Sequence, residues 1–227
     1  MLKKDKYILV LGSKPNSIIP KEDISHIYAA NGASELASQI IKNDPSVKLT
    51  SVVTGLEFMK NLEVQRRVIS ANPDRLISRI TSIDIQNYNF SKKVEYLFLK
   101  NIEQLILQSN FFKFGMLNIF LKEMNYEQKI IKKFIHLFKA IRYKSFIGIS
   151  TGFFSILCAL KEHPDSEIII SGIGMSGGGH YYNVNSDKYS KRSVVDRQLI
   201  LNLKKKYKKK LYTTDQNLEI NSGIKGW

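Results

Sequence analysis

The sequence predicts an α/β fold, a mostly parallel sheet with helices on both faces. Two observations predict it. Short runs rich in Val, Ile and Leu, such as residues 7–12, alternate along the chain with segments of helical periodicity, such as 34–42. The runs also end in small or polar turn residues. Because parallel strands need a crossover connection that is usually a helix, this alternation is typical of a Rossmann-like sheet.

The first part of the chain supplies the clearest strands, which we expect at 7–12, 27–32, 49–55 and 75–83. Helices are expected at 34–42 and 56–70. From residue 91 the pattern changes, because apolar residues recur at helical spacing from Leu97 to Phe138. We therefore expect a helical insertion at about 91–142, whose apolar stripe belongs to the core.

The α/β pattern then resumes. We expect a strand at 146–152, a helix at 152–161 and a strand at 167–174, followed by a closing helix at 193–209 and a strand at 210–214. Between the strand expected at 167–174 and the helix expected at 193–209 lies a Gly-rich segment. We expect this segment, at about 175–192, to form a lid over a site. A tail runs on to Trp227. No linker divides the chain, so one domain is expected over 1–227.

The composition supports a globular protein with a strong positive charge. Of 227 residues, 43% are hydrophobic and 24% charged, which provides material for a core and excludes wholesale disorder. The 35 Lys and Arg residues exceed the 20 Asp and Glu residues, giving a formal net charge of +15. This charge would attract polyanions such as nucleic acid, anionic lipid or acidic sugars. A general bias toward Lys, Ile and Asn is the alternative explanation.

The cysteine content and the lack of a long apolar run bear on location. Cys158 stands alone, which excludes an intramolecular disulfide and a cysteine-based metal cluster, and we expect it to lie in the core. No run reaches the roughly 18–20 apolar residues of a membrane span, and the first residues do not resemble a signal peptide. We expect a cytoplasmic protein that meets a membrane only peripherally, on its inner face.

The residues that follow the predicted strands suit a nucleotide. In an open parallel sheet, ligands bind outside the carboxyl ends of the strands. The turn at 12–17, Asn31 after the second strand, and Ser150-Thr151-Gly152 at a helix start offer small residues with amide or hydroxyl groups. The helix start could hold a phosphate on its N–H groups, or Ser150 and Thr151 could only cap the helix.

Missing motifs narrow the choice of nucleotide. The first turn lacks the G-x-G-x-x-G of dinucleotide binders, and G-x-x-x-x-G-K-[ST] does not occur, so NAD enzymes and P-loop NTPases are not favoured. The sequence has no Asp-x-Asp after a strand, a motif normally seen in metal-dependent sugar transfer. The histidines, His26, His136, His163 and His180, show no ligand spacing. We therefore expect neither a metal nor a cofactor to be required.

Several short motifs together resemble one known family. The first strand leads into Gly12-Ser13-Lys14-Pro15-Asn16-Ser17, and Asn31 follows the second strand. Ile149-Ser150-Thr151-Gly152 and Ser171-Gly172-Ile173-Gly174 follow in order, before the closing helix and strand at 196–212. This pattern resembles the bacterial lipooligosaccharide-type sialyltransferases, which use CMP-activated nonulosonic acids on a GT-A-like variant fold. The likeness covers most of the chain outside the helical middle.

The resemblance implies a site and an activity. The activity would be metal-independent, inverting transfer of a nonulosonic acid, a sialic-acid-like sugar, from CMP to a glycan or glycolipid acceptor of a lipopolysaccharide or capsule. The residues implied to bind the cytidine nucleotide are Gly12, Asn16, Ser17, Asn31, Ser150, Thr151, Gly152, Gly172 and Ile173.

The family's lid residues have partial counterparts. Its two phosphate-contacting tyrosines correspond to Tyr182 and Tyr189, whereas its catalytic histidine corresponds to Arg192. Arginine stays protonated and cannot act as a general base. His180 in the lid could be the base instead. Alternatively, Arg192 neutralises charge while a carboxylate, Asp196 or Asp187, is the base, or the register of the alignment differs.

A lysine-rich segment adds an expectation about partners. Residues 204–210 contain six lysines, at the end of the last helix. They could face anionic lipid, steer an acidic glycan, or only complement the helix dipole. Two alternatives to the transferase remain: a nucleotide-binding member of the fold that has lost catalysis, and a basic nucleic-acid-binding module, the latter not favoured because no such motif occurs. The sequence leaves the oligomeric state open, a homo-oligomer included.

Overall fold

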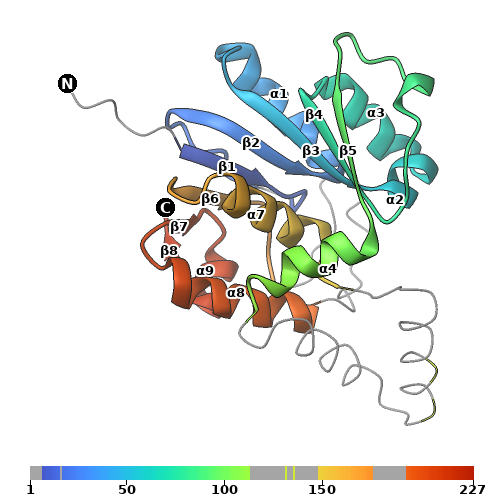
Figure 1. The fold of residues 1–227 in the computed structure, drawn as a ribbon. Helices are drawn as coiled ribbons and strands as arrows, with labels where there is room; N and C mark the ends of the chain where they lie inside the picture. Colours follow the sequence, from blue (N-terminus) through green and yellow to red (C-terminus); the bar gives the residue numbers. More distant parts are fainter. Residues whose placement is uncertain (1–6, 16, 113–130, 132–134, 136–147, 176–192) are drawn as a thin grey trace.

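The computed structural model describes residues 7–15, 17–112, 131, 135, 148–175 and 193–227. Their strands form one sheet of eight parallel strands in the order β5-β4-β3-β2-β1-β6-β7-β8 (Figure 1). The bounds are β1 Tyr7–Leu11, β2 Ile24–Ala30, β3 Lys48–Thr54, β4 Arg75–Arg79, β5 Glu95–Leu99, β6 Ile168–Ser171, β7 Leu211–Thr213 and β8 Lys225–Gly226. The predicted Rossmann-like α/β fold is confirmed.

The helices cover both faces of this sheet. Their bounds are α1 Ser34–Asn43, α2 Gly55–Lys60, α3 Leu62–Ala71, α4 Asn101–Ser109, α7 Thr151–Glu162, α8 Ser193–Tyr207 and α9 Gln216–Ser222, with 3-10 turns η1 Asn31–Ala33 and η2 Ile85–Asn87. Helices α1 and α3 lie on one face, and α4, α7, α8 and α9 on the other (Figure 1).

Alternating side chains of β1 fill the cores on the two faces of the sheet. In β1, Ile8 and Val10 pack with α7 and α8, whereas Leu9 and Leu11 pack with α1. All four side chains are buried, as expected for a parallel strand covered on both faces. Cys158 lies in the α7 core, where burial raises the pKa of its thiol to about 12. The prediction of a core cysteine is therefore confirmed.

Four elements differ from those predicted. The described part of the strand expected at 146–152, residues 148–150, is not a strand and leads directly into α7. The single helix expected at 56–70 is split at Asn61, whose side chain accepts hydrogen bonds from the backbone N–H groups of Glu63 and Val64 and so starts α3. The insertion expected at 91–142 begins instead with strand β5, which pairs with β4. The expected C-terminal tail forms α9 and β8, which extend the sheet beyond β7.

Helix α4 follows within the expected insertion, and residues 113–142 are described only at Ile131 and Ile135. Ile131 is 75% exposed and Ile135 49% exposed, so these members of the apolar stripe do not lie in the core of the chain. Of the lid expected at 175–192, all but Met175 lies outside the described residues. Within the described part of the chain, no helix combines the length and apolar character needed to cross a bilayer.

Candidate functional site

The strand order creates a topological switch point between β1 and β6. From β1 the chain moves outward through β2, β3, β4 and β5, and it then returns to the other side of β1 as β6. The loops that leave the carboxyl ends of β1 and β6 therefore diverge in opposite directions. In doubly wound sheets, this divergence opens the crevice in which ligands bind.

Two glycines allow these loops to lie close together at the point where they leave β1 and β6. Gly12 N–H donates to the Ser171 carbonyl at 2.8 Å, and Lys14 N–H donates to the Gly172 carbonyl at 3.0 Å. A side chain on Gly12 would overlap the Gly172 carbonyl oxygen. Gly172 has φ +67°, a left-handed conformation that favours glycine. These positions therefore require glycine so that the backbones can approach at the crevice.

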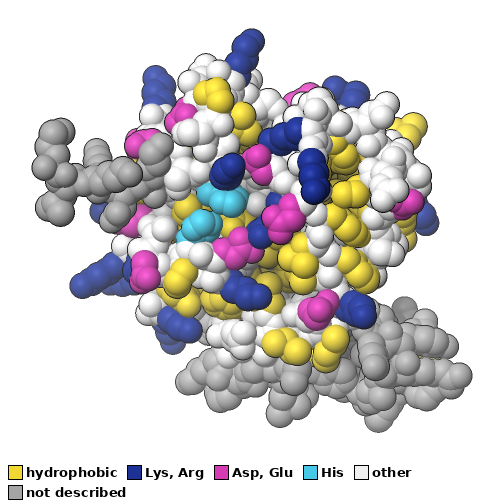
Figure 2. Space-filling model, turned by 45° about the horizontal axis from the view of Figure 1, so that its top comes forward, with side chains coloured by type: hydrophobic (Ala, Val, Ile, Leu, Met, Phe, Trp, Pro, Cys, Tyr) yellow, Lys and Arg dark blue, Asp and Glu magenta, His cyan; other side chains and the backbone are white. Residues whose placement is uncertain are grey.

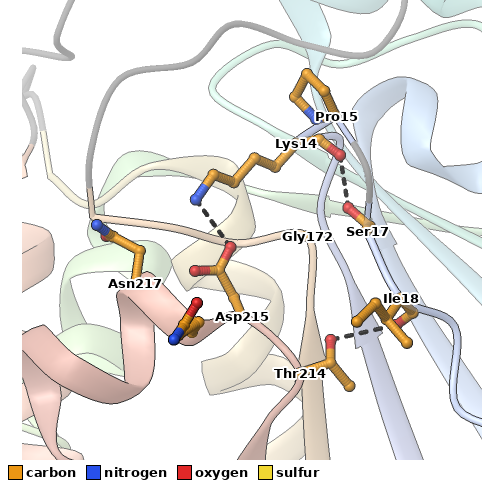
Figure 3. A pocket seen from close by; sticks show the side chains of 9 residues that line it. Lys14, Pro15, Ser17, Ile18, Gly172, Thr214, Asp215 and Asn217 are labelled. Carbon is orange, nitrogen blue, oxygen red and sulfur yellow. Dashed lines mark hydrogen bonds and ion pairs between the residues drawn. The ribbon is translucent and has the colours of Figure 1, made fainter.

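A pocket of about 210 Å³ opens beside Gly172 (Figure 3). Its lining residues come from the loops after β1, β6 and β7 and from the start of α9: Lys14, Pro15, Ser17, Ile18, Gly172, Thr214, Asp215, Gln216 and Asn217. Ser17 Oγ donates to the Lys14 carbonyl at 2.5 Å. Thr214 Oγ1 donates to the Ile18 carbonyl at 3.2 Å.

The pocket contains an ion pair that the sequence did not suggest. Lys14 Nζ lies 2.9 Å from Asp215 Oδ2, and the side chains are 23% and 10% exposed. Asp215 also accepts from Leu218 N–H at 2.9 Å and so caps α9. The pair is separated by 201 residues along the chain. It is brought together because β1 pairs with β6 and β6 pairs with β7.

The start of α7 forms the next part of the site. Ser150 Oγ accepts from Phe153 N–H at 3.5 Å, so Ser150 caps the helix. Gly152 leaves space for Ile173, whose Cγ1 would lie 3.3 Å from an added Cβ. The start of α7 thus packs against the loop after β6, at the crevice.

Threonine and asparagine side chains continue the site across β2 and β3. Thr151 Oγ1 lies 3.0 Å from Thr54 Oγ1. Thr54 N–H in turn donates to Asn31 Oδ1 at 3.3 Å. Asn31 adopts φ +49°, so its backbone turns sharply at the end of β2. The predicted residues Asn31 and Thr151 are therefore linked through Thr54.

Arg79, at the carboxyl end of β4, is a residue that sequence reasoning missed. Its side chain is 2% exposed. Nη1 donates to Thr151 Oγ1 at 3.3 Å, Nη2 to the Ile149 carbonyl at 3.0 Å, and Nε to Gln104 Oε1 at 3.1 Å. The guanidinium carbon also lies 4.2 Å from the centroid of the Phe154 ring. Arg79 thereby places a buried positive charge behind the start of α7.

The structure brings together the predicted nucleotide-binding residues that it describes, namely Gly12, Ser17, Asn31, Ser150, Thr151, Gly152, Gly172 and Ile173. Their contacts run from the pocket to the end of β2. Asp196, one candidate base, is buried and accepts from Ser150 N–H at 2.8 Å, an anchoring role. The remaining predicted residues, Asn16, His180, Tyr182, Asp187, Tyr189 and Arg192, lie outside the described residues.

A second polar cluster lies at the amino end of the sheet. Tyr28 OH donates to Glu162 Oε2 at 2.5 Å, and Arg75 Nη2 lies 2.7 Å from Glu162 Oε1. His163 Nε2 lies 3.1 Å from Tyr28 OH, and the rings of His26 and His163 are 5.1 Å apart. Figure 2 shows the histidines among acidic and basic side chains on this surface.

Burial dominates the electrostatics of this amino-end cluster. It lowers the pKa of His26 to about 4, helped by the positive charges of His163 and Arg75. Burial also lowers the pKa of His163 and raises that of Tyr28. Hydrogen bonds from Tyr28 and Arg75 overcome the effect of burial and lower the pKa of Glu162. These bonds tie the end of α7 to β2 and β4.

Comparison with protein-family models, curated proteins and solved structures found no match to this chain. Among the described residues, no group of three or more His, Cys, Asp and Glu side chains is arranged to hold a metal ion. The motifs and the geometry of the crevice are therefore the observations that bear on function.

Proposed function

We propose that this chain is a glycosyltransferase that moves a nonulosonic acid from a CMP-activated donor to a cell-surface glycan acceptor. The observation that carries the proposal is the contact between segments far apart in the sequence. The turn after β1, Asn31, the start of α7 and Gly172-Ile173 all meet at the switch point. These are the segments to which the sequence resemblance assigns the nucleotide.

The chemistry of the pocket supports a nucleoside monophosphate. Lys14 offers a positive charge, and Asp215 and Asn217 offer groups that can bind ribose or sugar hydroxyls. The N–H groups at the start of α7 lie on the same side of the sheet, where the helix dipole favours an anion. A ligand that carries both hydroxyl groups and a phosphate would fit this combination of groups.

The proposed reaction is a direct displacement at the anomeric carbon. The acceptor hydroxyl forms the new bond as the bond to the CMP phosphate oxygen breaks, and a base takes the hydroxyl proton. We assign the base to His180, with Asp187 as the alternative, and the stabilisation of the departing phosphate to Tyr182, Tyr189 and Arg192. CMP leaves as a monophosphate ester, so the reaction requires no metal.

The proposed setting is the cytoplasm, at the inner face of the cytoplasmic membrane. The lysines at 204–210 give the end of α8 a positive charge that would attract anionic lipid or an acidic acceptor. A peripheral attachment of this kind would bring the enzyme to a glycolipid acceptor.

The test begins with nucleotide binding, measured by calorimetry and by thermal unfolding. We expect CMP to bind and UMP, UDP, GDP and NAD to bind far more weakly; CMP at 100 times its Kd should stabilise the fold by about 2.7 kcal/mol. A preference for UDP or NAD would overturn the donor. Transfer is then followed with CMP-activated nonulosonic acids and glycan acceptors, comparing the wild type with His180→Ala.

Two outcomes would favour the alternatives. If CMP binds but the chain neither transfers the sugar nor hydrolyses the donor, a nucleotide-binding protein that has lost catalysis is favoured. The arginine at position 192, where the family has its catalytic histidine, also fits that alternative. Salt-sensitive binding to oligonucleotides, with no CMP binding, would favour a nucleic-acid-binding module.

A further inference from the structure

The corner between α2 and α3 exposes three large apolar side chains within seven residues. Leu56 and Met59 on α2 are 43% and 38% exposed, and Leu62, the first residue of α3, is 75% exposed. Because residues three apart are neighbours on a helix surface, Leu56 and Met59 share one side of α2. We call these three residues the α2 corner.

The α2 corner is not part of a core. None of its three side chains belongs to the hydrophobic cores of the described residues, whereas Phe58 beside them is fully buried with residues of α3. Apolar side chains that gather on a surface mark a place where the protein meets another apolar phase or partner. The corner therefore requires an explanation other than folding.

The charges of the corner nearly cancel. Residues 55–62 contain one cation, Lys60, and one anion, Glu57, and both are exposed. An attraction of this surface to a partner is therefore apolar rather than electrostatic. A lysine beside exposed apolar side chains also suits a membrane interface, because its stem can follow the apolar groups while its ammonium group stays in water.

The α2 corner lies at the edge of the sheet that holds the crevice. Helix α2 starts directly after Thr54, the last residue of β3 (Figure 1). Thr54 itself contacts Asn31 and Thr151 in the crevice. A bilayer that bound the corner would therefore lie at the same edge as the proposed nucleotide site.

The lysine-rich segment at 204–210 lies at the other edge of the sheet. Helix α8 starts near the crevice, where Asp196 accepts from Ser150 N–H, and it ends just before the amino end of β7. There Lys210 Nζ donates to the carbonyl of Pro164, which precedes β6, at 2.8 Å. These lysines would attract an anionic surface, but contact through them alone would turn the crevice away from that surface.

We infer that the α2 corner inserts its apolar side chains into a lipid bilayer and so holds the crevice at the membrane surface. Moving large apolar side chains from water into the boundary between headgroups and acyl chains is favourable. A glycolipid acceptor would then meet the crevice where its sugar leaves the bilayer. This last consequence rests on the proposed function, whereas binding of the corner to lipid does not.

The first experiment measures binding of the full chain to vesicles of phosphatidylcholine, which carries no net charge. We expect L56Q/M59Q/L62Q to lower the partition coefficient at least tenfold. The matched variant L56M/M59L/L62M keeps the apolar side chains and should stay within twofold of the wild type. Urea unfolding checks that both variants fold. Equal binding by the glutamine variant and the wild type, or no binding by the wild type, would overturn the inference.

A charge variant separates this contact from attraction by lysines. K204Q/K205Q/K206Q should bind phosphatidylcholine vesicles within twofold of the wild type, because the lysines act through charge. It should bind vesicles that contain phosphatidylglycerol more weakly, and added salt should remove that difference. If the lysine variant instead loses binding to phosphatidylcholine as the glutamine variant does, the α2 corner has no specific role.

A fluorescent label locates the contact. Cys158 is buried, so a single cysteine introduced at the surface can be labelled selectively. A label at Leu62→Cys should shift to shorter wavelength when vesicles are added. The control is Ile220→Cys on α9, because Ile220 is 73% exposed and lies at the other end of the sheet. Equal shifts at both positions, or a shift at Leu62→Cys that needs only more protein and no lipid, would contradict insertion; the latter would indicate a second copy.

The final experiment tests the link to the acceptor. The same glycan is offered either attached to a lipid in phosphatidylcholine vesicles or free in solution. We expect the wild type to have at least a tenfold lower KM for the lipid-linked form, and L56Q/M59Q/L62Q to lose this preference. A preference that survives in this variant would contradict the link. Absence of transfer to either acceptor would contradict the proposed function and leave the vesicle result, which needs no nucleotide, unaffected.

Discussion

Arg79 donates a hydrogen bond to Thr151, with 3.3 Å between Nη1 and Oγ1. A guanidinium can only donate, so the oxygen of Thr151 must accept, and its own proton points elsewhere. That proton can reach Thr54 Oγ1, at 3.0 Å, or a ligand in the crevice. Arg79 therefore orients a hydroxyl group at the proposed phosphate site without being exposed there.

This relationship predicts the effect of Arg79→Lys. Lysine keeps the positive charge, but its single nitrogen cannot replace the three guanidinium nitrogens that donate hydrogen bonds to three acceptors. The hydroxyl group of Thr151 therefore loses its fixed orientation. We expect CMP affinity to fall about tenfold and the free energy of unfolding to fall by about 2–3 kcal/mol. Arg75→Lys is the control: its partner Glu162 lies at the other edge of the sheet, so it should lower stability and leave CMP affinity unchanged. An Arg79→Lys protein with wild-type CMP affinity would remove Arg79 from the site.

The glycines of the crevice lead to a prediction about stability. Gly172→Ala introduces a side chain at positive φ and against Ser17 Oγ. We expect it to lower the free energy of unfolding by about 2–3 kcal/mol. Gly152→Ala meets only Ile173, at 3.3 Å or more, and gains helix propensity, so it should be within about 1 kcal/mol of the wild type. Urea unfolding measures both variants, and equal destabilisation would contradict the packing described.

Continuous hydrophobic runs made the central strands predictable. Ile168-Ile169-Ile170 and Ile8-Leu9-Val10-Leu11 are buried on both faces, so their sequence leaves little choice of structure. Strand β5 was missed because it lies at the edge of the sheet and is only half-buried, and its apolar residues also fit helical spacing. Strand β8 has two residues, Lys225 and Gly226, and its pairing with β7 leaves no pattern in the sequence.

The candidate site was predictable only where short motifs follow strands. Gly12, Thr151 and Gly172 were found in this way, and all three lie at the crevice. Arg79 was missed because a charged residue at a strand end is ordinarily exposed, and its burial depends on Gln104 and Phe154 from other elements. Asp215 was missed because its partner Lys14 comes from the other end of the chain.

The Lys14–Asp215 ion pair predicts how the pocket responds to phosphate. If Lys14 faces the nucleotide phosphate, Lys14→Gln should weaken CMP binding about tenfold and leave binding of cytidine, which has no phosphate, within twofold. Asp215→Asn keeps an acceptor for the cap of α9 and frees Lys14, so CMP affinity should hold or rise. Calorimetry with both ligands measures this. If cytidine and CMP weaken equally in Lys14→Gln, the lysine contacts no phosphate.

The histidines of the amino-end cluster lead to a prediction about pH. We expect acid to destabilise the fold at pH values above those at which the carboxylates of the cluster become protonated. His26 has a pKa of about 4 in the folded chain and about 6.5 when unfolded, so the unfolded state binds more protons between these values. Stability is therefore complete above pH 6.5 and falls as the pH approaches 4. The lowered pKa of His163 acts in the same direction. Discounting for partial exposure, we expect a loss of about 1–2 kcal/mol from His26 between pH 7 and pH 5.

Substitution of the two histidines tests the origin of this pH dependence. His26→Gln can still bond to Thr50 Oγ1, which lies 2.8 Å from His26 Nε2, but it has no charge to gain. The groups that face His26 (Arg75, Glu162, Asp74 and Tyr28) remain in place. Urea unfolding from pH 7 to pH 5 should therefore give a flatter stability profile for His26→Gln/His163→Gln than for the wild type. Because the pKa of Glu162 lies below 4.5, its contribution is lost only at lower pH, and both proteins should share that later loss. If stability depends on pH above pH 5 in the double variant as it does in the wild type, these histidines bind protons equally in the folded and unfolded states. That result would contradict their lowered pKa values.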